Sequence, residues 1–190
     1  MNANKVRFGL EKLYIAKVTE ENGTLTYGTP VPFPGAVSIT EEARGDEAEF
    51  WADNVPYFLY RSSTGRDVTL TVAEVPEFFK TDYLGATKDE NGVLVEGGAD
   101  TRQNFALLYE FDGDQHATKH CYYYCKASLG SLEGETIGDN GTEPQTTELT
   151  IAALPRPDNK YDKISTGDTI DDTVFANWYQ SVYEPDFGSN

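Results

Sequence analysis

The sequence predicts a mainly β protein: a β-sandwich with one short internal helix and a short C-terminal helix or arm. Short runs rich in Val, Ile, Thr, Tyr and Phe alternate with turn residues along most of the 190 residues. Asn-Gly occurs at 22–23 and at 91–92, and this pair is the strongest short signal for a β-hairpin. Aromatic residues make up 13% of the chain, which argues against disorder despite the low hydropathy.

The first half of the chain is predicted to form hairpins. RFGLEKLYIAKVTE and TLTYG are expected to pair across Asn22-Gly23, and GAVSIT is a further strand. VPYFLYRSS and DVTLTVAEV are expected to pair across Thr64-Gly65. Val68, Leu70 and Val72 alternate with threonines, so one face of the second strand should be buried.

The second half begins with the internal helix. Pro76 opens PEFFKTDYLG, and Gly85 ends it. An Asn-Gly hairpin in KDENGVLVEGGAD, a hairpin over 103–127, a Gly-rich connection without rigid structure (SLGSLEGETIGDNGTEP) and the strand TTELTIAAL follow. We expect one domain over 1–155 and a C-terminal arm or helix over 156–190. That segment carries apolar residues at helical spacing and fits either docking on its own domain or packing on a neighbouring subunit: Val174, Phe175, Trp178, Tyr179 and Val182.

Both histidines and both cysteines lie in HATKHCYYYC, residues 116–125, with a spacing that suggests zinc. On a regular strand, His116 and His120 would lie about 13 Å apart on one face, and Cys121 and Cys125 equally far apart on the other. Four ligands cannot then converge, and the cysteines cannot form a disulfide. We predict no metal site and interpret the cysteines as small apolar core residues, with a site shared between chains as the metal alternative.

No catalytic motif is present: the chain has no G-x-S-x-G, phosphate-binding loop, G-x-G-x-x-G or H-E-x-x-H. The Asp112-Gly113-Asp114 turn lacks the downstream glutamate of a calcium loop. We predict neither enzyme activity nor a cofactor. Two alternatives stay open: a carbohydrate-binding β-sandwich, and a hydrolase that uses a carboxylate pair.

The chain has 15 basic and 32 acidic residues and a formal charge of −17, which argues against binding to nucleic acid phosphates. The sequence contains no apolar run long enough for a membrane span, and MNANKVRFGL does not resemble a signal peptide. We expect a protein that is made and kept soluble in a cytoplasm.

Several segments in order resemble the major tail protein, or tail tube protein, of long non-contractile-tailed bacteriophages of Gram-positive hosts. They are NKVRFGLEKLYIAKVTE, FWADN, DVTLTVAEVPEFFKTDYLG, ENGVLVEGGAD before FALLYEFDGD, and EPQTTELTIAALPRPD. The resemblance implies a tail-tube-type β-sandwich that forms hexameric rings, which stack into a hollow tube. DNA would pass through the lumen without specific binding, and no membrane is involved.

The same resemblance implies a virion protein, assembled in the host cytoplasm. Its partners would be further copies of itself and other tail proteins: the tape measure, tail terminator and distal tail proteins.

The acidic stretch from Glu41 to Asp53 is too charged for the core, and in related tubes a long loop at this point reaches the next ring. We therefore expect it to make contacts between rings, with two aromatic anchors among its carboxylates. The alternative is a solvated hairpin with Trp51 folded back on its own domain. The predicted contact residues are Glu41, Glu42, Asp46, Glu47, Glu49, Phe50 and Trp51.

Overall fold

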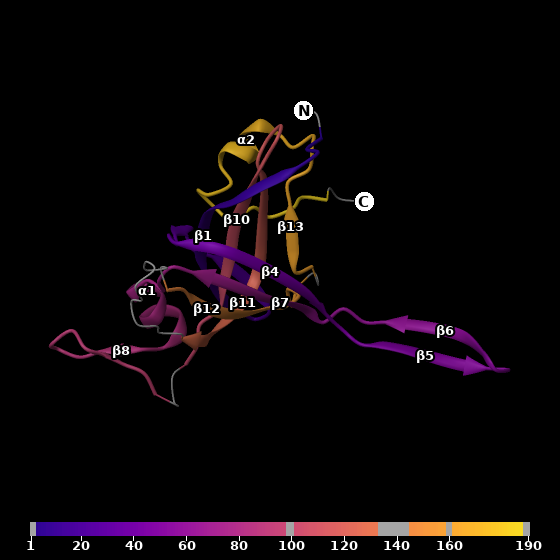
Figure 1. Ribbon diagram of the computed structural model, residues 1–190, viewed down its shortest axis with the longest axis horizontal. Helices are drawn as coiled ribbons and strands as arrows, with labels where there is room; N and C mark the ends of the chain where they lie inside the picture. The colour runs from indigo at the N-terminus through magenta and orange to yellow at the C-terminus, as the bar shows by residue number, and fades with distance from the viewer. Residues whose placement is uncertain (1–2, 98–100, 133–144, 159–160, 188–190) are drawn as a thin grey trace, which may run out of the picture.

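The computed structural model describes residues 3–97, 101–132, 145–158 and 161–187, and it confirms a mainly β fold with short helices (Figure 1). The connection was predicted over residues 128–144, and most of it, residues 133–144, lies outside the described residues. The strands are β1 (Arg7–Glu21), β2 (Thr24–Tyr27), β3 (Val31–Pro32), β4 (Ala36–Arg44), β5 (Glu47–Ala52), β6 (Val55–Arg61), β7 (Gly65–Val72), β8 (Thr87–Lys88), β9 (Leu94–Val95), β10 (Phe105–Gly113), β11 (Thr118–Leu132), β12 (Thr147–Ala153) and β13 (Lys163–Ser165). The helical segments are α1 (Glu77–Phe79), the π-helical turn η1 (Lys80–Leu84) and α2 (Asp172–Ala176).

Nine strands form one antiparallel sheet in the order β2-β1-β10-β11-β12-β7-β4, with β3 beside β1 and β13 beside β11. β1 and β4 also contact each other although four strands separate them in this order, so the sheet curls. Among the described residues, the pairings do not divide these strands into the two separate sheets of a sandwich.

Both faces of the central strands are buried, as the side chains of β10 illustrate. Phe105, Leu107 and Tyr109 point into one hydrophobic cluster, the inner core, which the curled sheet shares with α1 and η1. Ala106 and Leu108 point into a second cluster, the outer core, on the opposite face. Because both faces are covered, β10 has an unbroken apolar run instead of the alternation seen in β7.

The predicted internal helix is present. It begins after Pro76, and Phe79 and Tyr83 pack against Phe105 in the inner core, with ring centroids 5.4 and 5.6 Å away. Its last turn is π-helical, and the backbone N–H of Ala86 donates to the carbonyl of Lys80. Gly85 ends it at φ 92°, a left-handed conformation that favours glycine.

The C-terminal segment covers the outer core. Asp171 accepts hydrogen bonds from the backbone N–H groups of Thr173 and Val174, as an N-cap of α2 should. The helix is only five residues long, yet Trp178 and Val182 beyond it are buried in the outer core. The segment therefore packs on its own chain, whereas the division into domains at residue 155 stays a prediction.

Lys119, which interrupts an otherwise apolar strand face, is explained by α2. Its ammonium group donates to the carbonyl of Phe175 at 2.7 Å and lies 3.8 Å from the centre of the Phe175 ring. Burial lowers the pKa of Lys119, while its stem packs under the helix. It thereby supplies a donor to a carbonyl in the last turn of α2.

Two strand predictions are wrong, and two short strands were missed. β6 does not pair with β7: it pairs with β5, and β7 pairs with β4 and β12. Residues 128–132 belong to β11 rather than to an unstructured connection. The short strands β3 and β13 were not predicted, because two or three residues carry no periodic signal.

Candidate assembly surface

Residues 36–72 form one long two-stranded ribbon, and the candidate site is its outer half. β4 pairs with β7 at the base, and β5 pairs with β6 beyond it. Hydrogen bonds continue the pairing through the junction, from the Thr64 N–H to the Arg44 carbonyl and from the Ser62 N–H to the Asp46 carbonyl, both 2.9 Å. β5 and β6 project away from the curled sheet (Figure 1). We call residues 46–61 the ribbon arm.

The local sequence explains why the arm is a hairpin. Ala52 pairs with Val55, so Asp53-Asn54 is a two-residue turn, with φ values of 53° and 62°. A type I′ turn needs positive φ at both positions, and Asp and Asn tolerate it better than most residues. At the junction, a Cβ on Gly45 would lie 1.9 Å from the Ser62 carbonyl oxygen, so glycine permits the close approach of the two legs.

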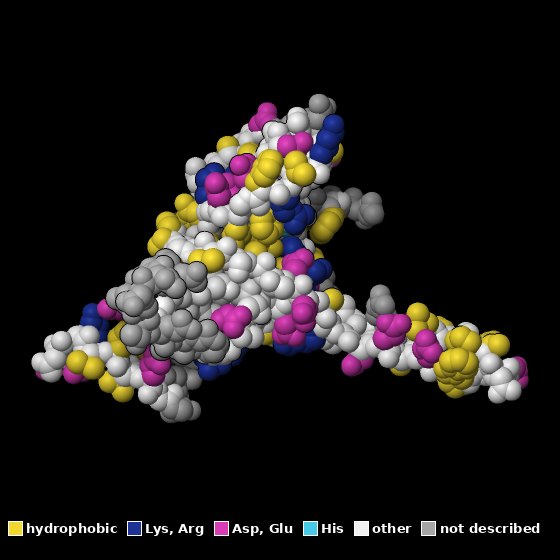
Figure 2. Space-filling model, in the orientation of Figure 1, with side chains coloured by type: hydrophobic (Ala, Val, Ile, Leu, Met, Phe, Trp, Pro, Cys, Tyr) yellow, Lys and Arg dark blue, Asp and Glu magenta, His cyan; other side chains and the backbone are white. Residues whose placement is uncertain are grey.

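The arm concentrates exposed apolar side chains. Trp51 is 58% exposed and Tyr57 is 73% exposed, although neither lies at a chain end. Figure 2 shows hydrophobic side chains gathered along the outer part of the arm, with acidic ones nearer its base. The exposed set is Phe50, Trp51, Val55, Tyr57, Phe58, Leu59 and Tyr60. A contiguous patch of this kind marks an interaction site.

An isolated two-stranded ribbon is only marginally stable in water, because neither face is covered. β5 and β6 pair only with each other in the described part of the chain. The Trp51 indole N–H donates to the Glu49 carboxylate at 3.1 Å, and this contact lies within the arm itself. The arm therefore has the composition of a contact surface that lacks its partner.

The predicted contact residues divide into two groups. Asp46, Glu47, Glu49, Phe50 and Trp51 lie on the arm. Glu41 and Glu42 lie at the base, in β4, where they pair with Val68 and Asp67 of β7. All seven side chains are exposed, and the stretch is a strand rather than the predicted loop. Trp51 is not folded back on the sheet, so the part of the alternative that remains is a solvated hairpin, and the role of these residues in contacts between rings stays a prediction.

Glu41 has an intramolecular role. Its carboxylate accepts hydrogen bonds from the Tyr122 hydroxyl and from the Lys163 ammonium group, the latter at 2.5 Å. Arg66 lies 3.6 Å away as a second cation. These contacts join β4 to β11 and β13, so Glu41 fixes the base of the ribbon to the sheet.

Sequence reasoning missed the second leg of the arm. VPYFLY was expected to pair with DVTLTVAEV, yet it pairs with β5, and Tyr57, Phe58, Leu59 and Tyr60 are exposed. Two signals pointed to the hairpin: the Asp53-Asn54 pair, and Pro56, since proline is confined to strand edges, strand starts and bulges.

The His/Cys cluster has a different geometry from the one predicted. Phe105 pairs with Cys125 but Leu107 pairs with Tyr122, so β11 contains one extra residue, a β-bulge, between these pairs. As a result Cys121 lies in the outer core and Cys125 in the inner core, on opposite faces rather than the same face. Both are buried free thiols whose pKa is raised by burial.

His120 stacks on Tyr109 at 4.9 Å, and burial lowers its pKa to about 4. No group of three potential metal ligands lies together in the described residues. The absence of a metal site stays a prediction.

Two further groups of residues that the sequence singled out have structural roles. Asp114 accepts a hydrogen bond from the Lys5 N–H at 2.8 Å and so holds the N-terminal segment against the β10–β11 turn. Tyr122, Tyr123 and Trp178 are buried, so they cannot stack on a sugar. Among the described helices, none has the length and apolarity to cross a membrane.

The outer edges of the sheet are β2 and β4. Each has backbone N–H and carbonyl groups on one side that no other strand of the described chain pairs with. The ribbon arm and these two strand edges are therefore candidate surfaces for assembly.

The family model described as phage tail tube protein matches residues 1–169. No curated protein matches the sequence. The chain is similar to a solved structure of the anti-feeding prophage cap, described as a tube terminating cap, with 11% identity, a TM-score of 0.47, and coverage of 87% of this chain and 95% of that one. It is also similar to a chain of an extracellular contractile injection system in a PVC sheath-tube complex (13% identity, TM-score 0.45, covering 86% and 93%) and to one in a PVC sheath/tube terminator (13%, 0.43, covering 82% and 94%).

Proposed function

Since the chain belongs to the phage tail tube protein family, we propose that its copies close into hexameric rings, which stack into the hollow tube that delivers DNA. Its role as a structural component of the virion tail follows from the family. The ring number, the contacts and the passage of DNA are proposals. So are assembly in the host cytoplasm and the further partners, which are the tape measure, tail terminator and distal tail proteins.

Within a ring, the contacts run through the sheet edges at β2 and β4. A cyclic ring needs a heterologous interface, in which one surface of a subunit meets a different surface of the next. The two free edges lie at opposite ends of the strand order and supply unpaired backbone groups, which supports this arrangement.

Between rings, the ribbon arm makes the contact. The observation that carries this proposal is the set of exposed aromatic side chains on a ribbon paired only with itself within the described residues. Burying such side chains in an interface contributes the anchors that dominate binding energy. Such a role needs no catalysis and no cofactor.

DNA passes through the lumen without a specific site. The formal charge of −17 supports this, because a wall that repels phosphates gains no counterion-release affinity for a duplex. A tube wall of positive charge would instead bind the DNA strongly and impede its movement.

The test removes the arm without disturbing the sheet. Residues 46–61 are replaced by Asn-Gly, so that Gly45 and Ser62 are joined by a tight turn and the β4–β7 pairing remains. The replacement begins at residue 46 because Ala43 and Arg44 pair with Arg66 and Gly65, and a deletion that included them would disturb the β4–β7 pairing. The matched control is Asp53→Asn with Asn54→Gly, which puts the same turn on the full-length arm.

Both variants are expected to keep the wild-type circular dichroism spectrum. The control should form tubes in electron micrographs, whereas the truncated protein should stop at monomers or single rings. Tubes of normal length from the truncated protein would contradict the inter-ring role of the arm. A closed ring with a number of subunits other than six, measured by native mass spectrometry, would contradict the hexamer.

A further inference from the structure

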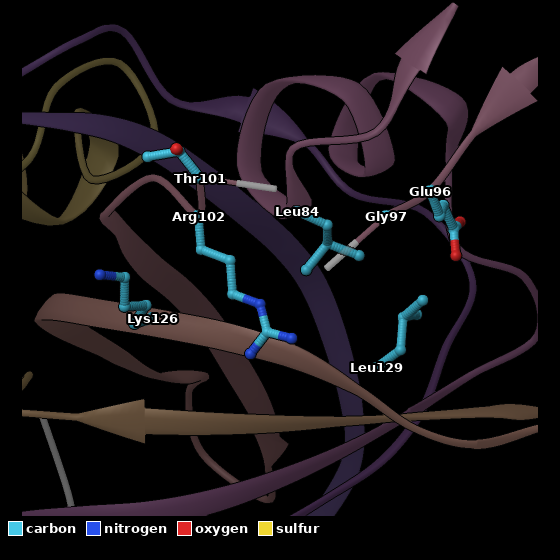
Figure 3. Close-up of a pocket in the computed structure, with 7 residues that line it drawn as sticks. All are labelled: Leu84, Glu96, Gly97, Thr101, Arg102, Lys126 and Leu129. Carbon is cyan, nitrogen blue, oxygen red and sulfur yellow. The ribbon is translucent and has the colours of Figure 1, made fainter. Parts of the chain in front are cut away.

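A pocket of about 860 Å³ opens beside the β8–β9 hairpin, on the side of the molecule away from the ribbon arm (Figures 1 and 3). It is lined by Leu84, Glu96, Gly97, Thr101, Arg102, Lys126 and Leu129. These residues come from η1, from the chain that follows β9 and precedes β10, and from β11. Its size is within the range of sites that enclose several side chains.

The pocket presents the Arg102 cation beside an apolar surface, and a second cation, Lys126, lies at its edge. Figure 3 shows the Arg102 side chain lying between Lys126 and the two leucines, with Glu96 across from it; the Lys126 ammonium group points away from the pocket, at its edge. Within the described residues, no ion pair involves Arg102 or Lys126.

The two cations stand out because basic residues are scarce in this chain, 15 against 32 acidic ones. Elsewhere most of the described basic side chains face a carboxylate: Lys12, Arg44, Arg66, Lys88, Arg156 and Lys163. Two exposed cations beside an exposed leucine are therefore suited to an acidic partner with an apolar anchor.

The ribbon arm has this complementary composition. Glu47 and Glu49 alternate along β5 and so share one face, and the contact from the Trp51 indole places that ring on the same face. The face therefore carries two carboxylates and one exposed indole.

We propose that the pocket receives this face of the ribbon arm from a second copy of the chain. Glu47 and Glu49 then meet Arg102 and Lys126, while Trp51 packs against Leu84 and Leu129. The inference rests on the proposed role of the arm between rings, and it names the surface that receives the arm. Because arm and pocket lie on opposite sides of one subunit, the contact is heterologous and can repeat from ring to ring.

The main test reverses charges. Arg102→Glu with Lys126→Glu, the reversed pocket, is expected to raise the protein concentration needed for tube formation by about tenfold or more. The reversed arm, Glu47→Lys with Glu49→Lys, should do the same. A chain that carries all four changes should assemble nearly as the wild type does. Lys5→Glu with Lys17→Glu is the control, since it changes the net charge equally at two exposed sites that do not line the pocket.

The outcomes separate this inference from the proposed function. Wild-type assembly by the reversed pocket would overturn the docking site and leave the tube proposal intact. Failure of the fourfold variant to recover would show that the pocket meets another partner, such as a different acidic segment, and would also overturn it. A loss of assembly as large in the Lys5/Lys17 control would assign the effect to net charge and reject the contact.

Crosslinking provides a second measurement without charge changes. Copies carrying Ala52→Cys are mixed with copies carrying Thr101→Cys and treated with a flexible bis-maleimide under tube-forming conditions. Cys121 and Cys125 should not react, because both are buried and burial raises their thiol pKa. Covalent dimers are expected only from the mixture, and their absence from formed tubes would overturn the docking site.

Discussion

The two tryptophans of this chain lie in two apolar segments that extend from the sheet, one buried and the other exposed. Trp178, in the C-terminal segment, is 3% exposed and stacks on Tyr183 at 6.1 Å. Trp51, in the ribbon arm, is 58% exposed and contacts Glu49 of its own strand. Both segments leave the sheet and both are rich in aromatic residues, so composition alone does not separate them.

The difference lies in what each segment finds on its own chain. The C-terminal segment meets an apolar sheet face and Lys119, which binds the carbonyl of Phe175, and its own Arg156 binds the Glu184 carboxylate at 2.6 Å. The arm extends beyond the sheet and, among the described residues, pairs only with itself. The comparison teaches that an exposed apolar segment signals a partner when its own chain has no surface to cover it.

The largest expected effect on stability comes from a substitution in the C-terminal segment. Trp178→Ala should lower the free energy of unfolding by about 3–5 kcal/mol, because it leaves a large cavity in the outer core. Urea unfolding followed by far-UV circular dichroism measures this change. A loss below about 1 kcal/mol would mean that the C-terminal segment adds little to the fold.

Acid should weaken the opposite face of the sheet, through His120, whose ring stacks on Tyr109 of the inner core and whose backbone pairs with Ser165 of β13. Burial lowers its pKa from 6.5 to about 4, with Lys163 and Arg7 adding to the shift and Glu41 opposing it. Between these two pKa values the unfolded chain binds more protons than the folded chain, so stability falls as the pH falls from about 6.5 to about 4.

This contribution amounts to at most about 3 kcal/mol. His120→Phe can still stack on Tyr109 but cannot be protonated, so its stability should depend less on pH. Unfolding curves of both proteins at pH 7 and pH 4.5 give the comparison. Equal pH dependence in the two proteins would show that His120 is not the titrating group.

Arg156 should have an intermediate effect. Its guanidinium is 4% exposed, pairs with Asp158 and Glu184, and lies within 5.5 Å of the ring centres of Tyr27, Tyr123 and Tyr161. Arg156→Ala removes these contacts and should cost about 1–3 kcal/mol, with faster amide hydrogen exchange over residues 163–187. Lys17→Ala, at an exposed position, is the control. Unchanged exchange in that segment would contradict the role of Arg156.

The smallest effect on stability belongs to Trp51. Trp51→Ala should change the free energy of unfolding of the monomer by no more than about 0.5 kcal/mol, since the side chain is exposed. Tube formation should nevertheless weaken. In wild-type protein, acrylamide should quench tryptophan fluorescence less after assembly than before it. If assembly reduces quenching equally in Trp51→Phe, the indole that assembly protects is not that of Trp51.

Much of the fold could be predicted from local pattern. The alternation of Val68, Leu70 and Val72, the Asn22-Gly23 turn and the Pro76 to Gly85 helix are each determined by neighbouring residues, and each is confirmed. The β-bulge in β11 could not be predicted, because one inserted residue changes the face of every later side chain without altering composition. Cys121 and Cys125 were placed on one face for that reason.

The candidate site was half predictable. Charge identified β5, since a strand with Glu47 and Glu49 cannot enter a core. The partner of β6 was assigned wrongly, because VPYFLY was paired with the strand that follows it and only the position of the Asp53-Asn54 turn reveals its pairing with β5. Whether an apolar strand is buried depends on what lies beside it, and this is a property of the whole fold.

The ribbon that runs from β4 to β7 also works as a spacer of adjustable length. Among the residues that the structure describes, its two legs pair only with each other beyond Gly65, so inserting one residue in each leg adds one cross-strand pair and moves the tip outward by about 3.3 Å. Removing one pair shortens it equally, and neither change alters the packing of the two cores. Since side chains alternate along a strand, changes by two pairs preserve the face that the tip presents. The distance spanned by the arm can therefore vary in steps of about 6.6 Å while the sheet that anchors it stays the same.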